Sequence, residues 1–327
     1  MRFYTGKRVL VTGGTGMIGK PLVEMLIREG AKVRIVSLDD PSRAHPEAEF
    51  IKADLTDFKS CMDICKDMEI VFSLVGIKGS PKMMKEKPAS YFVSSLLFNT
   101  NMMEAARRCK VQRYLYTSSV GVYAQAEIFN EDDVHKTLPS QNDFFGGWHK
   151  RTGELQAEAY RIEYGWDKIS IVRPANVYGP YDNFDPENAM VIPSLIHKAI
   201  SGDNPLRVKG DGHSVRDFIF SEDVARGMMY VVEKDYNLPV NLGSGTKHSI
   251  RDIVNMIVSN LEKKPEVEYE PTKSLGGDKI RLMNIERAKT IGFYPQISLQ
   301  EGIKKTIEWY RRNKDSASKR YNVFTAK

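Results

Sequence analysis

The chain has 327 residues, 41% of them hydrophobic and 28% charged, which is an ordinary globular composition with enough apolar material for a core. No apolar run approaches the ~20 residues that a membrane span needs, and nothing resembles a signal peptide, so we expect a cytoplasmic protein without a membrane partner. The net charge of +6 is spread along the chain rather than gathered on one helix, which favours an anionic small-molecule substrate over nucleic acid.

The three cysteines indicate neither a disulfide framework nor a metal site. Cys61 and Cys65 lie one helical turn apart, and Cys109 stands alone. A metal site at the first two would lack further ligands, so we expect buried or helical thiols and no bound metal.

The first elements predict a dinucleotide site. An apolar strand over 8–12 leads into Gly13, Gly16 and Gly19, and an amphipathic helix follows over 17–29. Gly13 permits the sharp turn, Gly16 lets a pyrophosphate approach bare backbone, and Gly19 lets the helix pack closely on the sheet. The helix N-terminus supplies N–H groups for the phosphates. The alternative is a loop with a structural role only. The predicted cofactor-binding residues here are Gly13, Thr15, Gly16, Met17, Ile18 and Gly19.

The next two strands refine the cofactor. Asp39 follows a strand over 32–37, where a carboxylate accepts hydrogen bonds from the adenosine ribose and repels a 2′-phosphate, so NAD is favoured over NADP. Asp54 and Leu55 follow a third strand over 49–52 and are expected to flank the adenine. The alternative for Asp54 is a plain helix cap.

The remaining pattern predicts a doubly wound parallel sheet with a smaller second lobe. Strands alternate with helices up to Pro174, after which prolines break the pattern and helices recur at 250–262 and 299–313. We therefore predict an α/β, Rossmann-type fold in two parts, a dinucleotide-binding domain over 1–180 with a returning segment near 215–245 and a mainly substrate-binding lobe over 181–327. The other predicted elements are strands at 70–75, 113–118 and 168–173 and helices at 90–109 and 148–164.

Several ordered blocks carry a resemblance that covers essentially the whole chain. The blocks are 12–19, 116–123, 173–180, 215–220, 241–245 and the closing Trp309-Tyr310. They resemble the extended short-chain dehydrogenase/reductase family, in the branch that acts on nucleotide-sugars. The resemblance implies an NAD-dependent enzyme that forms a homodimer through helices 90–109 and 148–164. The apolar residues of these helices are equally consistent with packing on the sheet.

A second resemblance concerns the substrate. Residues 181–193 are similar to the corresponding loop of the GDP-fucose synthases, which implies a nucleoside-diphosphate sugar with GDP favoured over UDP or dTDP. On this likeness Pro174 would contact the cofactor, and the substrate would be held by Asn176, Asn183, Val191, Arg216 and Arg281. For two of these residues an alternative to substrate binding stays open: Asn176 as a turn residue, and Arg216 in a salt bridge with Asp217 or Asp223.

The resemblance also implies the catalytic groups. In this family a serine or threonine and a tyrosine hydrogen-bond the reacting sugar hydroxyl, and a lysine four residues after the tyrosine lowers the tyrosine pKa and holds the nicotinamide ribose. The serine matches Ser119 and the lysine matches Lys150, but Gly146 stands where the tyrosine belongs. Glycine cannot transfer a proton, so another group must do so.

His149 is one candidate, because an imidazole titrates near neutral pH. The alternative is a solvent-exposed or capping histidine. A water bound to Ser119 remains a further possibility, and the other candidate side chains are Tyr123, Tyr178 and Tyr181.

Further departures from the family narrow the reaction. Met190 replaces the histidine of the fucose synthases and Gly121 replaces its cysteine partner, while Val120 and Gly121 replace the Asp-Glu pair of the 4,6-dehydratases. Dehydration and epimerisation at C3 or C5 are therefore disfavoured. We expect an NAD-dependent dehydrogenase or reductase that acts at C4 of a GDP-sugar of the mannose or heptose type. The alternatives are an NDP-sugar 4-epimerase and a non-catalytic NAD-binding protein.

Overall fold

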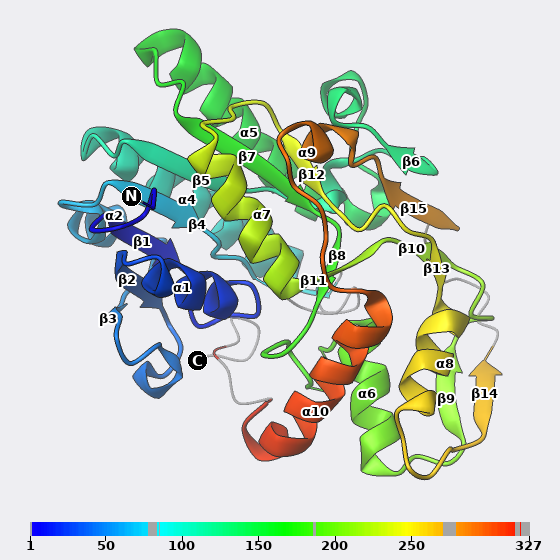
Figure 1. Ribbon diagram of the computed structural model, residues 1–327. Coiled ribbons are helices and arrows are strands. Elements are labelled where there is room, and N and C mark those ends of the chain that lie inside the picture. Colours follow the sequence, from blue (N-terminus) through cyan, green and yellow to red (C-terminus); the bar gives the residue numbers. More distant parts are fainter. Residues whose placement is uncertain are drawn as a thin grey trace.

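The computed structural model describes residues 2–77, 84, 86–185, 188–270, 279–317 and 321. Its main sheet is parallel and has the strand order β12-β7-β5-β4-β1-β2-β3 (Figure 1). The chain starts in the middle of the sheet, winds outward to β3, and then returns to build the other half from β4. The strands are β1 (Arg8–Thr12), β2 (Lys32–Ser37), β3 (Glu49–Lys52), β4 (Ile70–Ser73), β5 (Arg113–Thr117), β7 (Ile169–Pro174) and β12 (Val240–Leu242). This doubly wound order is that of a Rossmann-type fold, as the sequence predicted.

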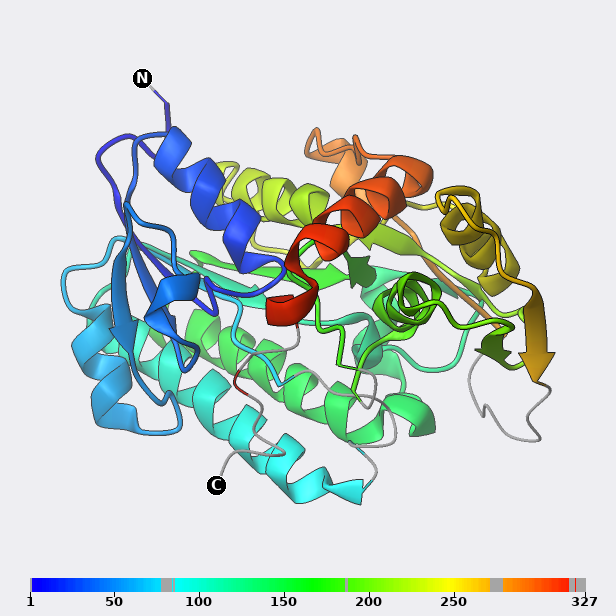
Figure 2. The same ribbon diagram turned by 90° about the horizontal axis from the view of Figure 1, so that it is seen from below.

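Helices cover both faces of the sheet (Figure 2). One face carries α1 (Gly19–Arg28) and α7 (Ser221–Glu233), and the other carries α2 (Phe58–Cys65), α4 (Pro88–Arg108) and α5 (Phe144–Tyr164). Because side chains alternate along a strand, Val9 and Val11 join the core beneath α1 and α7, whereas Leu10 joins the core beneath α2 and α4. This two-sided burial explains why β1 is apolar at consecutive positions.

The second lobe has its own hydrophobic core, which includes residues of α6, α8 and α10. Within the described residues, short strands form three smaller sheets: β8 pairs with β11, β9 pairs with β14, and a further sheet has the order β13-β10-β15-β6. The helices are α6 (Val191–Ser201), α8 (Ile250–Ser259), α9 (Glu286–Thr290) and α10 (Leu299–Ala317). The strands are β6 (Ile128–Phe129), β8 (Asn176–Tyr178), β9 (Leu206–Lys209), β10 (Val215–Arg216), β11 (Phe218–Phe220), β13 (His248–Ser249), β14 (Val267–Glu270) and β15 (Ile280–Met283).

Helix α5 begins earlier than its sequence predicts. It begins at Phe144 rather than at residue 148, so Gly146 and Gly147 lie within it. Glycine has a low helix propensity, which is why the pattern favoured a later start. At Gly147 a Cβ atom would lie 2.4 Å from the Cβ of Pro139, so the close contact with this loop requires glycine.

The thiols differ in exposure. Cys61 and Cys65 of α2 are buried, whereas Cys109, at the C-terminal end of α4, is partly exposed, and all three are unpaired. Burial raises the pKa of the Cys61 thiol to about 12, so this side chain stays protonated. The described part of the chain contains no helix long and apolar enough to cross a membrane, and no group of three or more side chains suited to a metal ion.

Candidate active site

The glycine turn has the geometry that a pyrophosphate site needs. Gly13 has a φ of +69°, and its N–H donates to the carbonyl of Val36 at 2.7 Å. A Cβ atom at Gly19 would lie 2.2 Å from the carbonyl oxygen of Gly13, so only glycine lets α1 start this close to the end of β1. Ile18 occupies the N-cap, where its apolar side chain offers no acceptor to the first-turn N–H groups. These groups fit the phosphates of a dinucleotide.

Asp39 lies beside this turn and is buried. Its carboxylate accepts a hydrogen bond from the hydroxyl of Thr15 at 2.7 Å and one from the backbone N–H of Tyr321 at 2.9 Å. The Arg43 Nε lies 4.0 Å from the same carboxylate. The structure therefore places Asp39 next to Thr15 and next to the backbone of Tyr321.

Asp54 has a different local role from the helix cap offered as its alternative. Its carboxylate accepts from the N–H of Thr56 at 2.9 Å, whereas Asp57 caps α2. The interpretation of Asp54 as a plain helix cap is therefore wrong. Leu55 is buried, and its carbonyl accepts from the side-chain amide of Asn101 at 3.2 Å.

Ser119 and Lys150 lie at the same carboxyl end of β5. The Lys150 ammonium donates to the carbonyl of Thr117 at 2.8 Å, and the Ser119 hydroxyl accepts from the N–H of Gly121 at 3.1 Å. Burial lowers the pKa of Lys150 to about 8, while the negative charge of Glu154 opposes this shift. The ammonium and the hydroxyl thus both lie near the carboxyl end of β5.

The position of the missing tyrosine is filled from another helix. A Cβ atom at Gly146 would lie 3.0 Å from the hydroxyl of Tyr91, which comes from α4. The imidazole of His149 lies behind it, with Nε2 3.3 Å from the Tyr91 hydroxyl and Nδ1 3.4 Å from the amide nitrogen of Asn99. The Tyr91 hydroxyl therefore lies where the side chain of a larger residue at position 146 would start.

His149 is buried, so the interpretation of this residue as solvent-exposed or capping is wrong. Only 3% of its surface is exposed, and its two ring nitrogens face side chains of α4. Burial, followed by the nearby charge of Lys150, lowers the pKa of His149 to about 2. The imidazole is therefore neutral and packs against α4, and none of its hydrogen bonds leads to Ser119.

The tyrosines proposed as substitutes have packing roles. The Tyr123 hydroxyl donates to the side chain of Asn241 at 2.5 Å, and the Tyr178 hydroxyl donates to the carbonyl of Leu299 at 3.3 Å. Both rings are buried. Tyr181 packs on Trp309, with ring centroids 4.9 Å apart.

Asp143 lies close to Ser119 and was not among the residues predicted from the sequence. A Cβ atom at Gly121 would lie 3.6 Å from the Ser119 hydroxyl and 3.5 and 3.8 Å from the Asp143 Cβ and Cγ, so both side chains border the same point. The Asp143 carboxylate also forms an ion pair with Arg281 at 2.7 Å. Its position three residues before Gly146 was the only sequence signal, because Arg281 and Ser119 are distant in the chain.

The two arginines predicted to bind substrate lie side by side. Arg216 and Arg281 are register partners in the parallel pair of β10 and β15. Arg216 donates to the carbonyl of Val215 at 2.8 Å. The Arg281 guanidinium pairs instead with Asp143, at 2.7 Å. A guanidinium suits a diphosphate because its planar fork matches phosphate oxygens.

The other predicted substrate residues lie near the start of the second lobe. Asn176 lies in β8 and its amide donates to the carbonyl of Asp217 at 2.9 Å, so its interpretation as a turn residue is wrong. The side chain of Asn183 accepts from the N–H of Asp185 at 3.0 Å, and Val191 begins α6. Pro186 and Glu187 of the same loop lie outside the described residues.

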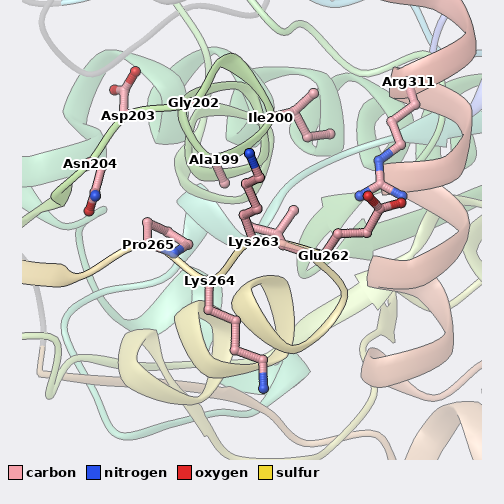
Figure 3. A pocket seen from close by; sticks show the side chains of 11 residues that line it. Ala199, Ile200, Gly202, Asp203, Asn204, Glu262, Lys263, Lys264, Pro265 and Arg311 are labelled. Carbon is pink, nitrogen blue, oxygen red and sulfur yellow. The ribbon is translucent and has the colours of Figure 1, made fainter.

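Two cavities are lined by residues other than Ser119, Lys150 and Asp143. One of about 590 Å³ borders α1, and its walls include Gly14, Lys20 and Tyr181. The other, of about 560 Å³, lies in the second lobe near the end of α6, where Glu262 and Arg311 point toward one another (Figure 3). Its lining contains none of the residues predicted to bind cofactor or substrate.

Comparison with known proteins decides the family. Residues 9–243 match the NAD dependent epimerase/dehydratase family. The chain belongs to this family. The match confirms the predicted resemblance, and it confirms an NAD-dependent enzyme of the nucleotide-sugar epimerase and reductase type.

Relatives with different substrates match over nearly the full length. GDP-L-fucose synthase 1 of Arabidopsis thaliana is 27% identical over 314 residues, covering 94% of each chain. A putative UDP-glucose 4-epimerase of Methanocaldococcus jannaschii is 29% identical over 315 residues, covering 93% of this chain and 99% of the relative. The solved structure of epimerase Mth375 from Methanothermobacter thermautotrophicus superposes with a TM-score of 0.86 and 29% identity, covering 97% of this chain and 95% of that one.

Proposed function

We propose that this protein is an oxidoreductase that acts at C4 of a nucleotide-sugar, with a GDP-sugar of the mannose or heptose type as the favoured substrate. The observation that carries the proposal is that Lys150 and Ser119 both lie near the carboxyl end of β5, where the Lys150 ammonium binds the carbonyl of Thr117. The glycine turn lies at the end of β1, and parallel strands direct their carboxyl ends to one edge of the sheet, where such folds bind their ligands.

The residues divide the work as follows. NAD, when bound, accepts a hydride from the sugar carbon or returns one to it. The Ser119 hydroxyl positions the reacting sugar oxygen, and the Lys150 ammonium holds the nicotinamide ribose. Arg216 binds the diphosphate, whereas the guanidinium of Arg281 is held by Asp143.

Guanine is the favoured base for two reasons. The loop over 181–193 is similar to that of the GDP-fucose synthases, and a GDP-L-fucose synthase matches the chain over nearly its whole length. A 4-epimerase is the second candidate, because a UDP-glucose 4-epimerase relative matches equally well. A non-catalytic NAD-binding protein is the third, since Gly146 removes the tyrosine of the family.

A product-mass assay tests the proposal. Purified protein is mixed with NAD and a panel of GDP-, UDP- and dTDP-sugars, and the corresponding 4-keto-sugars are tested with NADH. A GDP-sugar two mass units lighter, or a keto-sugar two units heavier, is the expected result. An unchanged mass with altered chromatographic retention would instead establish a 4-epimerase. A chain that binds NAD but converts no sugar in either direction would establish the non-catalytic alternative.

We also propose that the protein forms a homodimer through α4 and α5. Large apolar side chains are unusually exposed on these two helices, which pack side by side on one face of the sheet (Figure 2). Such exposed apolar area is typical of a protein–protein contact. The exposed residues of this kind are Val93 and Leu97 in α4 and Phe145, Leu155, Ile162 and Tyr164 in α5.

A further inference from the structure

The family's tyrosine is absent, yet hydride transfer from a sugar alcohol still releases a proton that some group must accept. The acceptor must lie beside the hydroxyl that positions the sugar, and it must reach solvent to pass the proton on. Among the candidates weighed above, His149 is buried against α4, and Tyr123 and Tyr178 are held in the core.

Tyr91 does not meet these requirements. Its hydroxyl lies 3.0 Å from where the Cβ atom of residue 146 would be, so it ends where the family's tyrosine would start. The same hydroxyl contacts the imidazole of His149 at 3.3 Å. Burial, with the nearby charge of Asp143, raises the pKa of Tyr91 to about 12, which keeps the phenol protonated at neutral pH.

We propose that Asp143 is the catalytic residue that accepts the proton in place of the missing tyrosine, and that Arg281 is the positioning residue that holds its carboxylate beside Ser119. This inference rests on the proposed function. Asp143 and Ser119 border the same point above Gly121, and the ion pair between Asp143 and Arg281 is 2.7 Å long. About a third (35%) of the Asp143 side chain is exposed, against 12% for Arg281, so the carboxylate faces solvent.

The local structure explains why the Asp143 side chain points to Arg281 and not to its own helix. Asp143 occupies the N-cap of α5, but its side chain makes no capping hydrogen bond and turns to Arg281 instead. An aspartate at this position commonly binds the helix's own N–H groups. Gly121 keeps the space between Asp143 and Ser119 open, because it has no side chain to fill it.

The step balances with the family's cofactor. As the C4–H electron pair leaves as hydride for NAD, the sugar O–H bond breaks and its proton passes to the carboxylate of Asp143. The carbon–oxygen double bond forms, the sugar is oxidised, the cofactor is reduced, and the exposed carboxyl then releases the proton to water. In the reverse direction the protonated carboxyl returns the proton to the keto oxygen.

Asp143→Asn tests the proposal, because it keeps the side chain's shape but cannot accept a proton. We expect turnover to fall about 10²- to 10⁴-fold, the range for loss of general acid–base catalysis. Calorimetry should show NAD and nucleotide-sugar affinities within about twofold of the wild type. Asp132→Asn is the matched control, because Asp132 forms a surface ion pair with Arg287 of the same 2.7 Å length, and it should keep full turnover.

Two rescues separate catalysis from a structural role. Tyr91→Phe with Gly146→Tyr removes the hydroxyl that crowds position 146 and restores the family's tyrosine. When both changes are added to Asp143→Asn, turnover should be at least ~10-fold higher than that of Asp143→Asn alone. Formate should likewise restore part of the turnover of Asp143→Ala, since it supplies a carboxylate to the vacated space.

The outcomes are distinct. An Asp143→Asn variant with more than half of the wild-type turnover would overturn the assignment and leave the proposed function intact. An inactive variant that neither rescue restores would assign Asp143 to structure alone and also overturn it. A wild-type chain that converts no nucleotide-sugar would overturn the proposed function and this inference together.

Discussion

Glu154 holds Arg173 in a two-point ion pair, with Nε to Oε1 at 2.9 Å and Nη2 to Oε2 at 2.7 Å, and both side chains are fully buried. The Ser118 hydroxyl donates to the same carboxylate. Glu154 lies one helical turn after Lys150, and Arg173 directly precedes Pro174. The pair therefore ties α5 to the ends of β5 and β7, the elements that carry the candidate catalytic groups.

Removing one partner of this pair should unfold the site. We expect Glu154→Ala to lower the free energy of unfolding by about 3–5 kcal/mol, because the Arg173 charge would remain buried without its counter-ion. Urea denaturation measures the change. Asp63→Ala removes half of an exposed pair with Lys66 and should leave the urea midpoint close to that of the wild type, because solvent screens this pair. Equal losses in the two variants would contradict this account.

Gly19→Ala should disrupt the cofactor site. The added Cβ would collide with the Gly13 carbonyl at 2.2 Å. We therefore expect the protein to be destabilised by about 1–3 kcal/mol and the Kd for NAD to rise at least tenfold. Gly202→Ala, at the end of α6, is the control: its Cβ meets open space and only the φ of +91° opposes it. That variant should lose about 1–2 kcal/mol of stability and keep its NAD affinity. Thermal unfolding and calorimetry measure both quantities.

The lowered pKa of Lys150 predicts an alkaline loss of activity. With a pKa of about 8, its ammonium loses its proton as the pH rises through this value, so turnover should halve near pH 8 and continue to fall. Lys150→Arg keeps its charge and should remove this limb of the pH profile, even where its overall turnover is lower. A profile of Lys150→Arg that superposes on the wild type would contradict the assignment.

The same residue should leave a mark on stability. Lys150 titrates near 8 in the folded chain and near 10.5 when unfolded, so between these values the unfolded state binds more protons. The Lys150 contribution to the free energy of unfolding therefore rises with pH across this window and is constant below it. The difference in stability between the wild type and Lys150→Met, measured by denaturation from pH 7 to 10.5, should show this slope.

The proposed dimer predicts a monomeric double variant. Leu97→Glu with Leu155→Glu places two charges on the exposed faces of α4 and α5. We expect the dissociation constant of the dimer to rise at least tenfold. Leu238→Glu alters a side chain that is also half exposed (50%) but lies outside these helices, and it should leave the mass in solution unchanged. Sedimentation velocity distinguishes the outcomes, and a monomeric wild type would exclude the interface.

Local patterns predicted the sheet well because its signals are short-range. The centre of β1 is a run of three apolar residues, Val9 to Val11, and the glycine turn after β1 has spacing that few other structures require. The main-sheet strand β12 was not predicted, and neither were short strands of the smaller sheets such as β6, β10 and β13, since pairing with distant partners rather than local propensity defines them. The early start of α5 was not predicted for a similar reason. Packing against Pro139 outweighs the low helix propensity of Gly146 and Gly147.

The site was predictable only where the family's pattern applies. Ser119 and Lys150 carry that pattern, and the structure brings them to one strand end. The side chains of His149 and Asp143 could not be oriented from sequence, because the partners of each come from segments far away in the chain. His149 packs on Tyr91, and Asp143 pairs with Arg281.

The unequal burial of the cysteines has a practical consequence for distance measurements. Cys61 and Cys65 are inaccessible, so a thiol-reactive spin label should attach at Cys109 without any mutagenesis. Because burial also raises the pKa of the Cys109 thiol, labelling should proceed faster at mildly alkaline pH. Cys109 ends α4, the helix of the proposed interface. A pulsed electron paramagnetic resonance experiment on the natural sequence would therefore report the separation between two copies directly.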